Sequence, residues 1–534
     1  MLGARRWLYI AHRWSGIVLC VFMALWFVSG VVMMYVGYPK LTPRERLAHL
    51  PDLVLPSGCC VAPAQALAAA QTEMHAGHGG RDNPNSMRGE SVAAELRLAM
   101  IGPKPYWLVR EGRHGEVSVD AISGLAATGF DAGHALEAAR RFAPSATPRI
   151  VELLRQDIFT VSRALDPYRP LYRVALDDEA GSELYVSTRT GEVVRDSTRF
   201  ERGWNYSGAI LHWLYPLKGE LLDRWRADVI IYLSLAGTVL ALLGIWIGLL
   251  RWRFTGTYRT GSRSPYRGGW MRWHHLSGLI FGLITLTWIF SGLMSMNPWK
   301  IFESGGLRPD LRAIAGVGLA RASFALSPSE AMSRAGYPVR EVAVRLFEGE
   351  PYYVLHGAAG QTRLIAASKA DSVPFEMFGE QALRAAAARS MPGYTIGKAT
   401  LLQAYDNYYY DRRAHTMSGH IERRLPMLRV EFDDPNRTWL HLDPYTGAIH
   451  SRLDDLGRVK RWLFNGLHSF DLRGFIDARP LWDISLILLS AGGCILCISG
   501  TVIGWRRLRR PRSAPATAMP LANPEPVTQA PSPV

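Results

Sequence analysis

Residues 5–34, RRWLYIAHRWSGIVLCVFMALWFVSGVVMM, decide the fold, because the chain carries a related stretch again at residues 267–296, RGGWMRWHHLSGLIFGLITLTWIFSGLMSM. At a constant offset of 262, His12 matches His274. In each copy a basic start leads to the histidine, a glycine follows four residues later, and about 20 apolar residues come next. A run of that length crosses the hydrocarbon core of a bilayer as a helix. We therefore expect two equivalent membrane helices, each with a histidine at the membrane edge.

Four apolar runs are long enough to span a bilayer: Ser15–Val36, Asp228–Leu250, Leu276–Met296 and Trp482–Gly504. The net charge of +15 is concentrated beside them, before the first run, between the second and third, and after the last. Arginines clustered at one side of the spans follow the positive-inside rule. This distribution places both chain ends in the cytoplasm and argues against nucleic acid as a partner.

Two long segments then lie outside the cytoplasm, which is the periplasm for a multi-pass protein of a bacterial inner membrane. In the first, residues 106–120 and 172–194 alternate as hairpins and residues 131–142 form an amphipathic pattern, so we expect α+β domains. The predicted order is 1–37 cytoplasmic N-terminus and first span, 38–225 first outer domain, 226–250 second span, 251–275 basic cytoplasmic loop, 276–297 third span, 298–481 second outer domain, 482–505 fourth span and 506–534 disordered cytoplasmic tail.

A second correspondence extends the repeat over nearly the whole chain. At an offset of 256, His212 matches His468, and the glycine pair Gly244/Gly248 matches Gly500/Gly504. Parallel repeats of this kind predict a pseudo-two-fold axis along the membrane normal, with a shared site between the halves. The paired glycines predict close approach of helices.

The motifs that recur in both halves resemble one known family. The HRWSG and HHLSG starts of the spans, and outer hairpins ending in DAISG, STRTG and DPYTG, are similar to the PepSY-associated transmembrane family over residues 5–510. The resemblance implies a membrane α-helical fold with four transmembrane helices, a two-fold internal repeat and α+β PepSY-like extracytoplasmic domains. Family members include iron-regulated inner-membrane proteins and haem-containing ferric-siderophore reductases.

Four histidines stand at repeated positions: His12 and His274 at the cytoplasmic ends of two spans, and His212 and His468 at matching outer positions. A lone interfacial histidine usually caps a helix or meets lipid headgroups. Two repeated pairs, one at each membrane face, favour bis-histidine ligation of haem iron, since low-spin haem needs two strong axial ligands. We expect two b-type haems, with His275 competing with His274 as a ligand and the repeat favouring His274.

Glycines support the inner pair. Gly16 and Gly278 lie one helical turn after His12 and His274, so a flat macrocycle has room to approach the backbone there.

Two further clusters have a bland and a functional interpretation. The patch containing Tyr408, Tyr409, Arg412 and Arg413 suits an anionic iron chelate, although a strand edge rich in tyrosine is an equal alternative. The loop with Met74, His75 and His78, near Met87, offers ligands for a soft metal, but a mobile insertion is the preferred interpretation. The adjacent Cys59 and Cys60 bridge each other only with strain, so we expect no disulfide framework.

The repeated histidine pairs predict a path for electrons across the membrane, and the resemblance implies that the protein is a haem-dependent reductase of ferric iron in a siderophore or another iron chelate. No dinucleotide fingerprint or P-loop is present in the sequence, so the electron donor is expected to be quinol or a separate cytoplasmic reductase. Two alternatives remain open: a non-enzymatic PepSY module that binds or regulates a partner protein, and an accessory protein for copper or iron transport.

Overall fold

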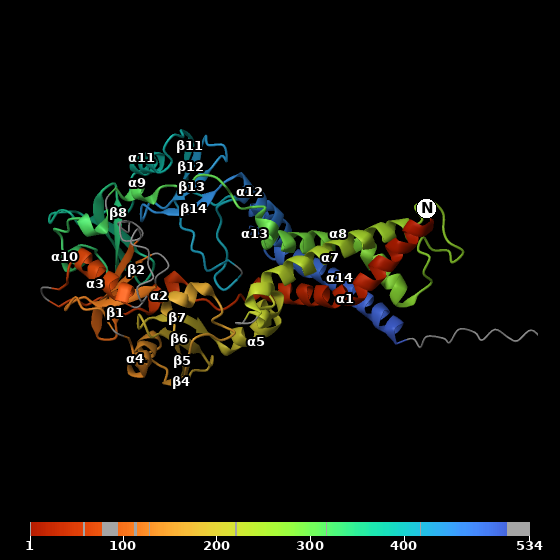
Figure 1. Ribbon diagram of the computed structural model, residues 1–534, viewed down its shortest axis with the longest axis horizontal. Helices are drawn as coiled ribbons and strands as arrows, with labels where there is room; N and C mark the ends of the chain where they lie inside the picture. The colour runs from red at the N-terminus through yellow and green to blue at the C-terminus, as the bar shows by residue number, and fades with distance from the viewer. Residues whose placement is uncertain are drawn as a thin grey trace, which may run out of the picture.

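Four long apolar helices form the stalk of the molecule in this computed structural model (Figure 1). They are α1 (Leu2–Tyr35), α7 (Asp223–Arg251), α8 (Gly269–Ser295) and α14 (Leu481–Leu508). All four are long and apolar enough to cross a membrane, which confirms the four predicted spans. The structure describes residues 2–56, 59–76, 94–111, 115–127, 129–218, 222–316, 318–416 and 418–509.

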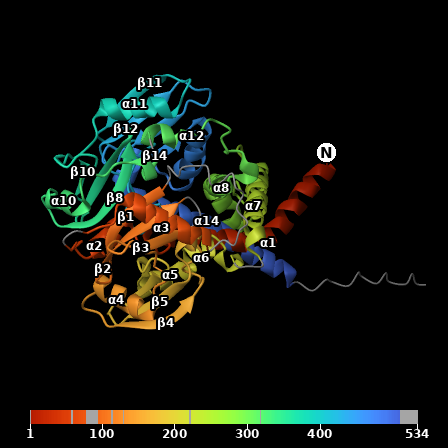
Figure 2. The ribbon, with the colours of Figure 1, turned by 60° about the vertical axis from the view of Figure 1, so that its left-hand side comes forward.

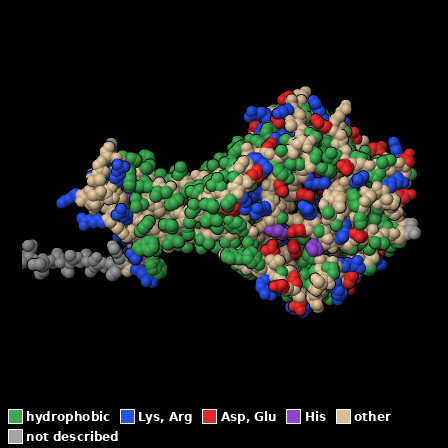
Figure 3. Space-filling model, turned by 180° about the vertical axis from the view of Figure 1, so that it is seen from behind, with side chains coloured by type: hydrophobic (Ala, Val, Ile, Leu, Met, Phe, Trp, Pro, Cys, Tyr) green, Lys and Arg blue, Asp and Glu red, His purple; other side chains and the backbone are tan. Residues whose placement is uncertain are grey.

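The four helices close into a ring in which α1 packs against α7 and α14, and α8 also packs against α7 and α14. Buried apolar side chains fill the interior, among them Met23, Phe27 and Trp288. Outward-facing apolar residues such as Ile280 and Leu283 are each 69% exposed. Figure 3 shows this apolar surface along the stalk, with Lys and Arg gathered at the free end. Such a surface is stable in lipid rather than in water.

One sheet joins the two outer segments. Its six strands run in the order β10-β9-β8-β1-β2-β3, and all their pairings are antiparallel. Strands β1 and β8 meet at the centre, where Leu98 lies opposite Val342. The strands are β1 (Ala94–Ile101), β2 (Lys104–Glu111), β3 (Glu116–Asp120), β8 (Val339–Phe347), β9 (Glu350–Gly357) and β10 (Thr362–Ala366). Backbone hydrogen bonds therefore connect the first outer segment to the second.

Two four-stranded antiparallel sheets complete the outer head, each with a helix packed against it, and Figure 2 places them at opposite ends of it. The first consists of β4 (Pro148–Leu154), β5 (Leu171–Leu176), β6 (Glu183–Ser187) and β7 (Val193–Ser197), with helix α4 (Ala132–Phe142). The second consists of β11 (Ile396–Leu402), β12 (Met427–Phe432), β13 (Trp439–Leu442) and β14 (Ile449–Leu453), with helix α11 (Glu380–Ser390). The predicted hairpins at 106–120 and 172–194 and the helix at 131–142 are confirmed.

A buried ion cluster reinforces the joint between the outer segments. Arg97 on β1 lies 2.5 Å from Glu116, 3.0 Å from Glu192 and 3.0 Å from Glu341 on β8. Arg46 also contacts Glu341, at 2.7 Å. Removing one partner from such a buried cluster leaves an uncompensated charge and costs about 3–5 kcal/mol.

Shorter helices and turns pack on the sheets or connect them to the stalk. They are α2 (Pro43–His49), α3 (Pro63–Ala76), α5 (Arg199–Ser207), α6 (Ala209–His212), α9 (Leu311–Ala315), α10 (Pro328–Ser333), α12 (Asp455–Arg461) and α13 (Arg473–Asp477), with single turns η2 (Arg163–Tyr168), η3 (Tyr215–Leu217), η4 (Pro298–Lys300), η5 (Leu319–Arg321) and η6 (Trp462–Gly466). Capping boxes begin α2, at Thr42 and Glu45, and α5, at Thr198 and Glu201. These caps fix where the chain enters each helix.

Two sequence-based expectations need comment. Cys59 and Cys60 do form a disulfide with each other, but it links neighbouring residues and closes no loop between distant segments. Of the predicted metal ligands, Met74 is buried in the apolar core at the end of α3. His78 and Met87 lie outside the described residues, as does the His75 side chain.

Candidate functional site

The inner histidine pair faces a cavity near the free end of the stalk. His12 on α1 and His274 on α8 have ring centroids 6.3 Å apart, with an angle of 38° between the ring planes. Both line a cavity of about 700 Å³ within the bundle. Each imidazole lies over a glycine of a neighbouring helix: a Cβ on Gly244 would come within 2.9 Å of His12 Cε1, and one on Gly500 within 3.3 Å of His274 Cε1.

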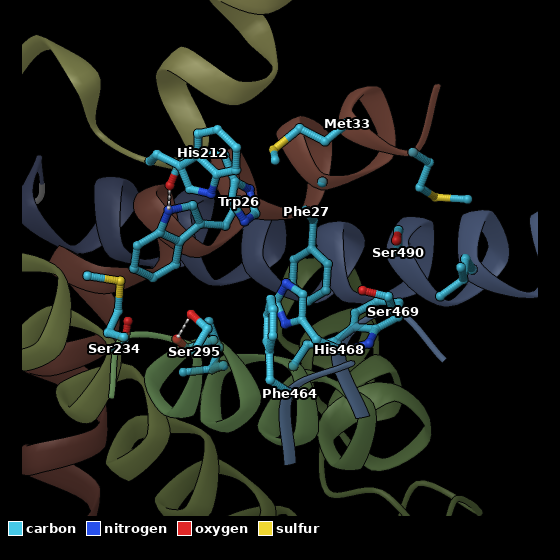
Figure 4. Close-up of a pocket in the computed structure, with 18 of the residues that line it drawn as sticks. Trp26, Phe27, Met33, His212, Ser234, Ser295, Phe464, His468, Ser469 and Ser490 are labelled. Carbon is cyan, nitrogen blue, oxygen red and sulfur yellow. Dashed lines mark hydrogen bonds between the residues drawn. The ribbon is translucent and has the colours of Figure 1, made fainter. Parts of the chain in front are cut away.

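The outer pair lies where the stalk meets the head. His212 ends α6 and His468 follows the π-type turn η6, and their ring centroids are 6.2 Å apart with a 73° angle between planes. Figure 4 shows the two imidazoles entering one cavity from these different elements, a cavity of about 180 Å³. A Cβ on Gly30 or Gly292 would stand 3.8 and 3.7 Å from the respective Cε1 atoms.

Serine hydroxyls fix the tautomer of the outer imidazoles. Ser29 Oγ lies 2.9 Å from His212 Nδ1, and Ser291 Oγ lies 3.0 Å from His468 Nδ1. Each hydroxyl also donates to a backbone carbonyl of its own helix, at 2.7 and 3.0 Å respectively. With its proton used in this way, the serine oxygen accepts from the Nδ1–H of the imidazole. The lone pair then resides on Nε2, the atom that a metal ligand needs.

The inner imidazoles differ in their partners. His274 Nδ1 lies 3.1 Å from Ser499 Oγ and 3.2 Å from the Leu496 carbonyl. The Ser499 hydroxyl donates to that same carbonyl, so Nδ1 again carries the proton. His12 Nδ1 is buried and has no hydrogen-bond partner among the described residues. The inner pair is therefore supported from one side only.

His275 has a structural position. Its Nδ1 contacts Ser264 Oγ at 2.8 Å and its Nε2 contacts the Gly248 carbonyl at 3.0 Å. Both ring nitrogens are thus occupied, one of them by the loop between α7 and α8. This arrangement favours His274 over His275 as the candidate ligand and makes His275 an anchor for the loop between α7 and α8.

The spacing of both pairs fits two axial ligands of one metal. Metal–imidazole bonds of about 2.0–2.1 Å on opposite sides of an ion place the two ring centroids about 6 Å apart. The distances of 6.3 and 6.2 Å agree with that value. Among the described residues no group of three or more His, Cys, Asp or Glu is placed to hold a metal ion, so the facing pairs are the arrangement to explain.

The walls of the inner cavity suit a planar, acidic macrocycle. Gly16 and Gly278 line the inner cavity, and a Cβ there would meet only ordinary contacts, at 3.8 Å and 3.6 Å. Arginines at the inner cavity offer partners for carboxylate groups: Arg13, Arg251, Arg506 and Arg507. The two arginines of the outer cavity, Arg226 and Arg412, already pair with Asp223 and Asp471. The inner cavity is the roomier of the two.

The two cavities adjoin inside the bundle. Met23 lines both of them, and beside it the rings of Phe27 and Trp288 have centroids 5.7 Å apart. Apolar and aromatic side chains therefore separate the histidine pairs without a charged residue between them in either cavity lining.

The predicted substrate residues are divided by the structure. Arg412 and Arg413 line an outer pocket of about 810 Å³, together with Tyr405. Tyr408 and Tyr409 do not line it. Tyr409 is 1% exposed, and its hydroxyl donates to the Arg424 carbonyl. The Tyr408 hydroxyl accepts a hydrogen bond of 3.0 Å from the indole N–H of Trp462. The two tyrosines hold the loop rather than face the pocket.

Several residues of the site were not singled out from the sequence. Ser29 and Ser291 recur at the repeat offset, but nothing in a single sequence says that they contact a histidine. We expected Gly244 and Gly500 to let helices approach closely. At Gly500 this is confirmed, since a Cβ there would stand 2.7 Å from Cys20 Sγ of α1, and both glycines also face an imidazole, which we did not expect. Their repetition at the same offset as the outer histidines was the available signal.

Two comparisons with known proteins bear on this arrangement. The comparison with curated proteins finds no match. A family model described as the PepSY-associated TM region matches residues 9–507, which includes the four stalk helices and all four repeated histidines. The chain belongs to the PepSY-associated transmembrane family.

Proposed function

We propose that the protein is an inner-membrane b-type di-haem oxidoreductase that passes electrons outward to ferric iron. One observation carries this proposal: in each of the two cavities, two imidazoles face each other at the spacing of two axial ligands of one metal ion. Their ring centroids are 6.3 Å apart in the inner pair and 6.2 Å apart in the outer pair. A capping or headgroup role does not require two histidines from different elements to face each other across a cavity. Nor does it require a serine behind the Nδ1 of each outer ring.

The orientation belongs to the same proposal. Arginines gather at the free end of the stalk, which the positive-inside rule assigns to the cytoplasm. Both termini are then cytoplasmic, and the outer head, composed of two PepSY-like domains, is periplasmic. The order of strands and helix is the same in the two outer segments, three strands, a helix and four strands, which supports an internal duplication.

The chain's own residues would hold and tune the cofactor. His12 with His274, and His212 with His468, supply the axial nitrogens. Ser29 and Ser291 keep Nδ1 of the outer imidazoles protonated, which raises the basicity of their Nε2 atoms. Bound haem supplies reversible one-electron chemistry at its iron.

The substrate and donor are proposed from position. The inner cavity opens beside the cytoplasmic end, where quinol or a separate cytoplasmic reductase has access. The acceptor side is the outer pocket, because Arg412 lines both that pocket and the outer histidine cavity. A ferric chelate bound there, such as a ferric siderophore, lies beside the outer pair, and reduction weakens the hold of the chelate on iron.

Absorption spectroscopy tests the proposal. Protein purified from cells supplied with haem precursor is expected to give a dithionite-reduced b-type spectrum with about two haems per chain. The double variant His274→Ala/His468→Ala is expected to be colourless while keeping its secondary structure. A folded wild-type protein that takes up no haem would refute the proposal and favour the PepSY binding module.

A further inference from the structure

The outer pocket has a chemistry more specific than iron chelates in general. Resting on the proposed function, we propose that it takes a ferric chelate bearing free carboxylates, of the polycarboxylate class, rather than a neutral chelate. The pocket lies on the head beside the stalk and measures about 810 Å³, within the range of small-molecule sites.

Positive charge dominates its lining. Seven arginines line the pocket, against three carboxylates, those of Asp411, Glu422 and Asp477. The arginines are Arg44, Arg412, Arg413, Arg423, Arg424, Arg473 and Arg479. Guanidinium groups bind carboxylates through two parallel hydrogen bonds, so this lining matches a ligand with several carboxylates.

Some of these arginines are already neutralised by the protein. Arg412 pairs with Asp471, Arg473 with Asp477 at 2.9 Å, and Arg479 with Asp483 at 3.0 Å. These pairs form the side of the pocket nearest the stalk.

The opposite side keeps its charge. Arg423 and Arg424 are half-buried and make no ion pair with any carboxylate of the described chain. The Arg424 guanidinium instead lies over the Tyr445 ring at 3.9 Å, with a hydrogen bond of 2.9 Å to the Thr362 hydroxyl. Arg423 lies over the Tyr410 ring at 5.7 Å. Aromatic faces hold these two cations in place without neutralising them.

A half-buried lysine and a histidine lie beside these arginines. Lys40 Nζ lies 2.9 Å from His420 Nε2, and His420 lines the pocket. Burial, then the charges of Lys40, Arg195 and Arg423, lower the pKa of His420 to about 4. Burial and the charge of Arg195 lower the pKa of Lys40 to about 8.

The pocket belongs to a loop that the other half lacks in this form. The connection between β11 and β12, residues 403–426, is longer than its counterpart between β4 and β5, residues 155–170. It reaches the first half, where the Gly37 N–H donates to the His415 carbonyl at 2.5 Å. Thr42, Pro43 and Arg44 complete the lining from that side. The longer loop of the second segment therefore builds most of this pocket, and the first segment adds one edge of it.

Binding of a redox-inert chelate tests this inference without haem. Full-length protein in nanodiscs of zwitterionic lipid is titrated with gallium(III) citrate by calorimetry, and in parallel with neutral gallium(III) tris(acetohydroxamate). The citrate complex is expected to bind at least about tenfold more tightly and to weaken as salt rises from 50 to about 300 mM. Equal affinities, or tighter binding of the neutral complex, would overturn the inference.

Variants locate the binding. Arg423→Gln and Arg424→Gln are each expected to weaken gallium citrate binding about tenfold. Arg384→Gln, on the exposed face of α11, removes one positive charge elsewhere and is the matched control. Unchanged affinity in both pocket variants overturns the inference. Loss of gallium citrate binding when anionic lipid replaces the zwitterionic lipid also overturns it, since lipid headgroups would then occupy the pocket.

The two proposals fail separately. A protein that takes up no haem but binds gallium citrate through Arg423 and Arg424 refutes the oxidoreductase and keeps the anionic site. A protein with two haems that shows no preference for the carboxylate chelate keeps the oxidoreductase and refutes the anionic site.

Discussion

Neighbouring histidines on α8 offer a matched pair of substitutions. His274→Ala removes an imidazole that faces His12 at 6.3 Å, whereas His275→Ala removes an imidazole whose two nitrogens contact Ser264 and Gly248. The two variants change the same atoms, one residue apart, on the same helix. Their difference isolates ligation from any general effect of losing a histidine.

The magnitudes follow from the contacts. With one ligand of the inner pair gone and the outer pair intact, His274→Ala is expected to hold about one haem per chain instead of about two. His275→Ala loses two hydrogen bonds of about 0.5–1.5 kcal/mol each, so its free energy of unfolding is expected to fall by about 1–3 kcal/mol. Its haem content is expected to stay at the wild-type value.

The assay is haem stoichiometry by the pyridine haemochrome spectrum, normalised to protein, with a thermal melt in the same detergent. At the outer site, His468→Ala is compared with the wild type and is expected to remove the other haem. The reasoning is refuted if His275→Ala loses half the haem while His274→Ala retains all of it.

Three further perturbations have defined outcomes. Ser29→Ala removes the acceptor for the Nδ1–H of His212, so the outer haem is expected to bind about tenfold more weakly with a shifted midpoint potential, read by redox titration. Gly244→Ala places a Cβ 2.9 Å from His12 Cε1 and is expected to halve the haem content. In Gly30→Ala the new Cβ stands 3.8 Å from His212 Cε1, and the haem content is expected to stay unchanged. Equal haem contents in the two variants would contradict this. The hydrogen bond with Glu45 raises the pKa of His415 in the folded protein. The protonated His415 therefore stabilises the fold fully below about pH 6.5, and this stabilisation is lost as the pH rises through the higher folded-state pKa. The melting temperature of wild type is expected to fall across that window relative to His415→Gln, and parallel curves would speak against it.

Much of the architecture follows from local patterns in the sequence. The four spans are visible because nothing but a membrane helix keeps about 20 residues free of charge. The hairpins and α4 are visible because alternation and amphipathic periodicity survive in short windows. The pairing of β1 with β8 is not visible, since period-two alternation marks a strand but names no partner. For that reason the single sheet that joins the outer segments emerges only in the structure.

The site was predictable to a lesser depth. The repeat offsets selected the four histidines and favoured His274 over His275, and the structure places them in two facing pairs. The serines behind them come from other elements, at sequence separations of 183 and 177 residues, which no local pattern encodes. The aromatic patch shows where the sequence misleads. We predicted Tyr409 as a substrate residue from the tyrosines and arginines around it, but tertiary packing buries its side chain.

Each half of the chain contributes one imidazole to the inner pair, one to the outer pair, and one of the two central strands of the shared sheet. A half produced alone would therefore expose β1 or β8 as an open edge and offer a solitary nitrogen at each leaflet. Co-expressed halves have a backbone seam along which to reassociate, and the return of colour would report that reassociation. If haem binds as proposed, its uptake and the closure of the sheet would both report the assembly of the two halves.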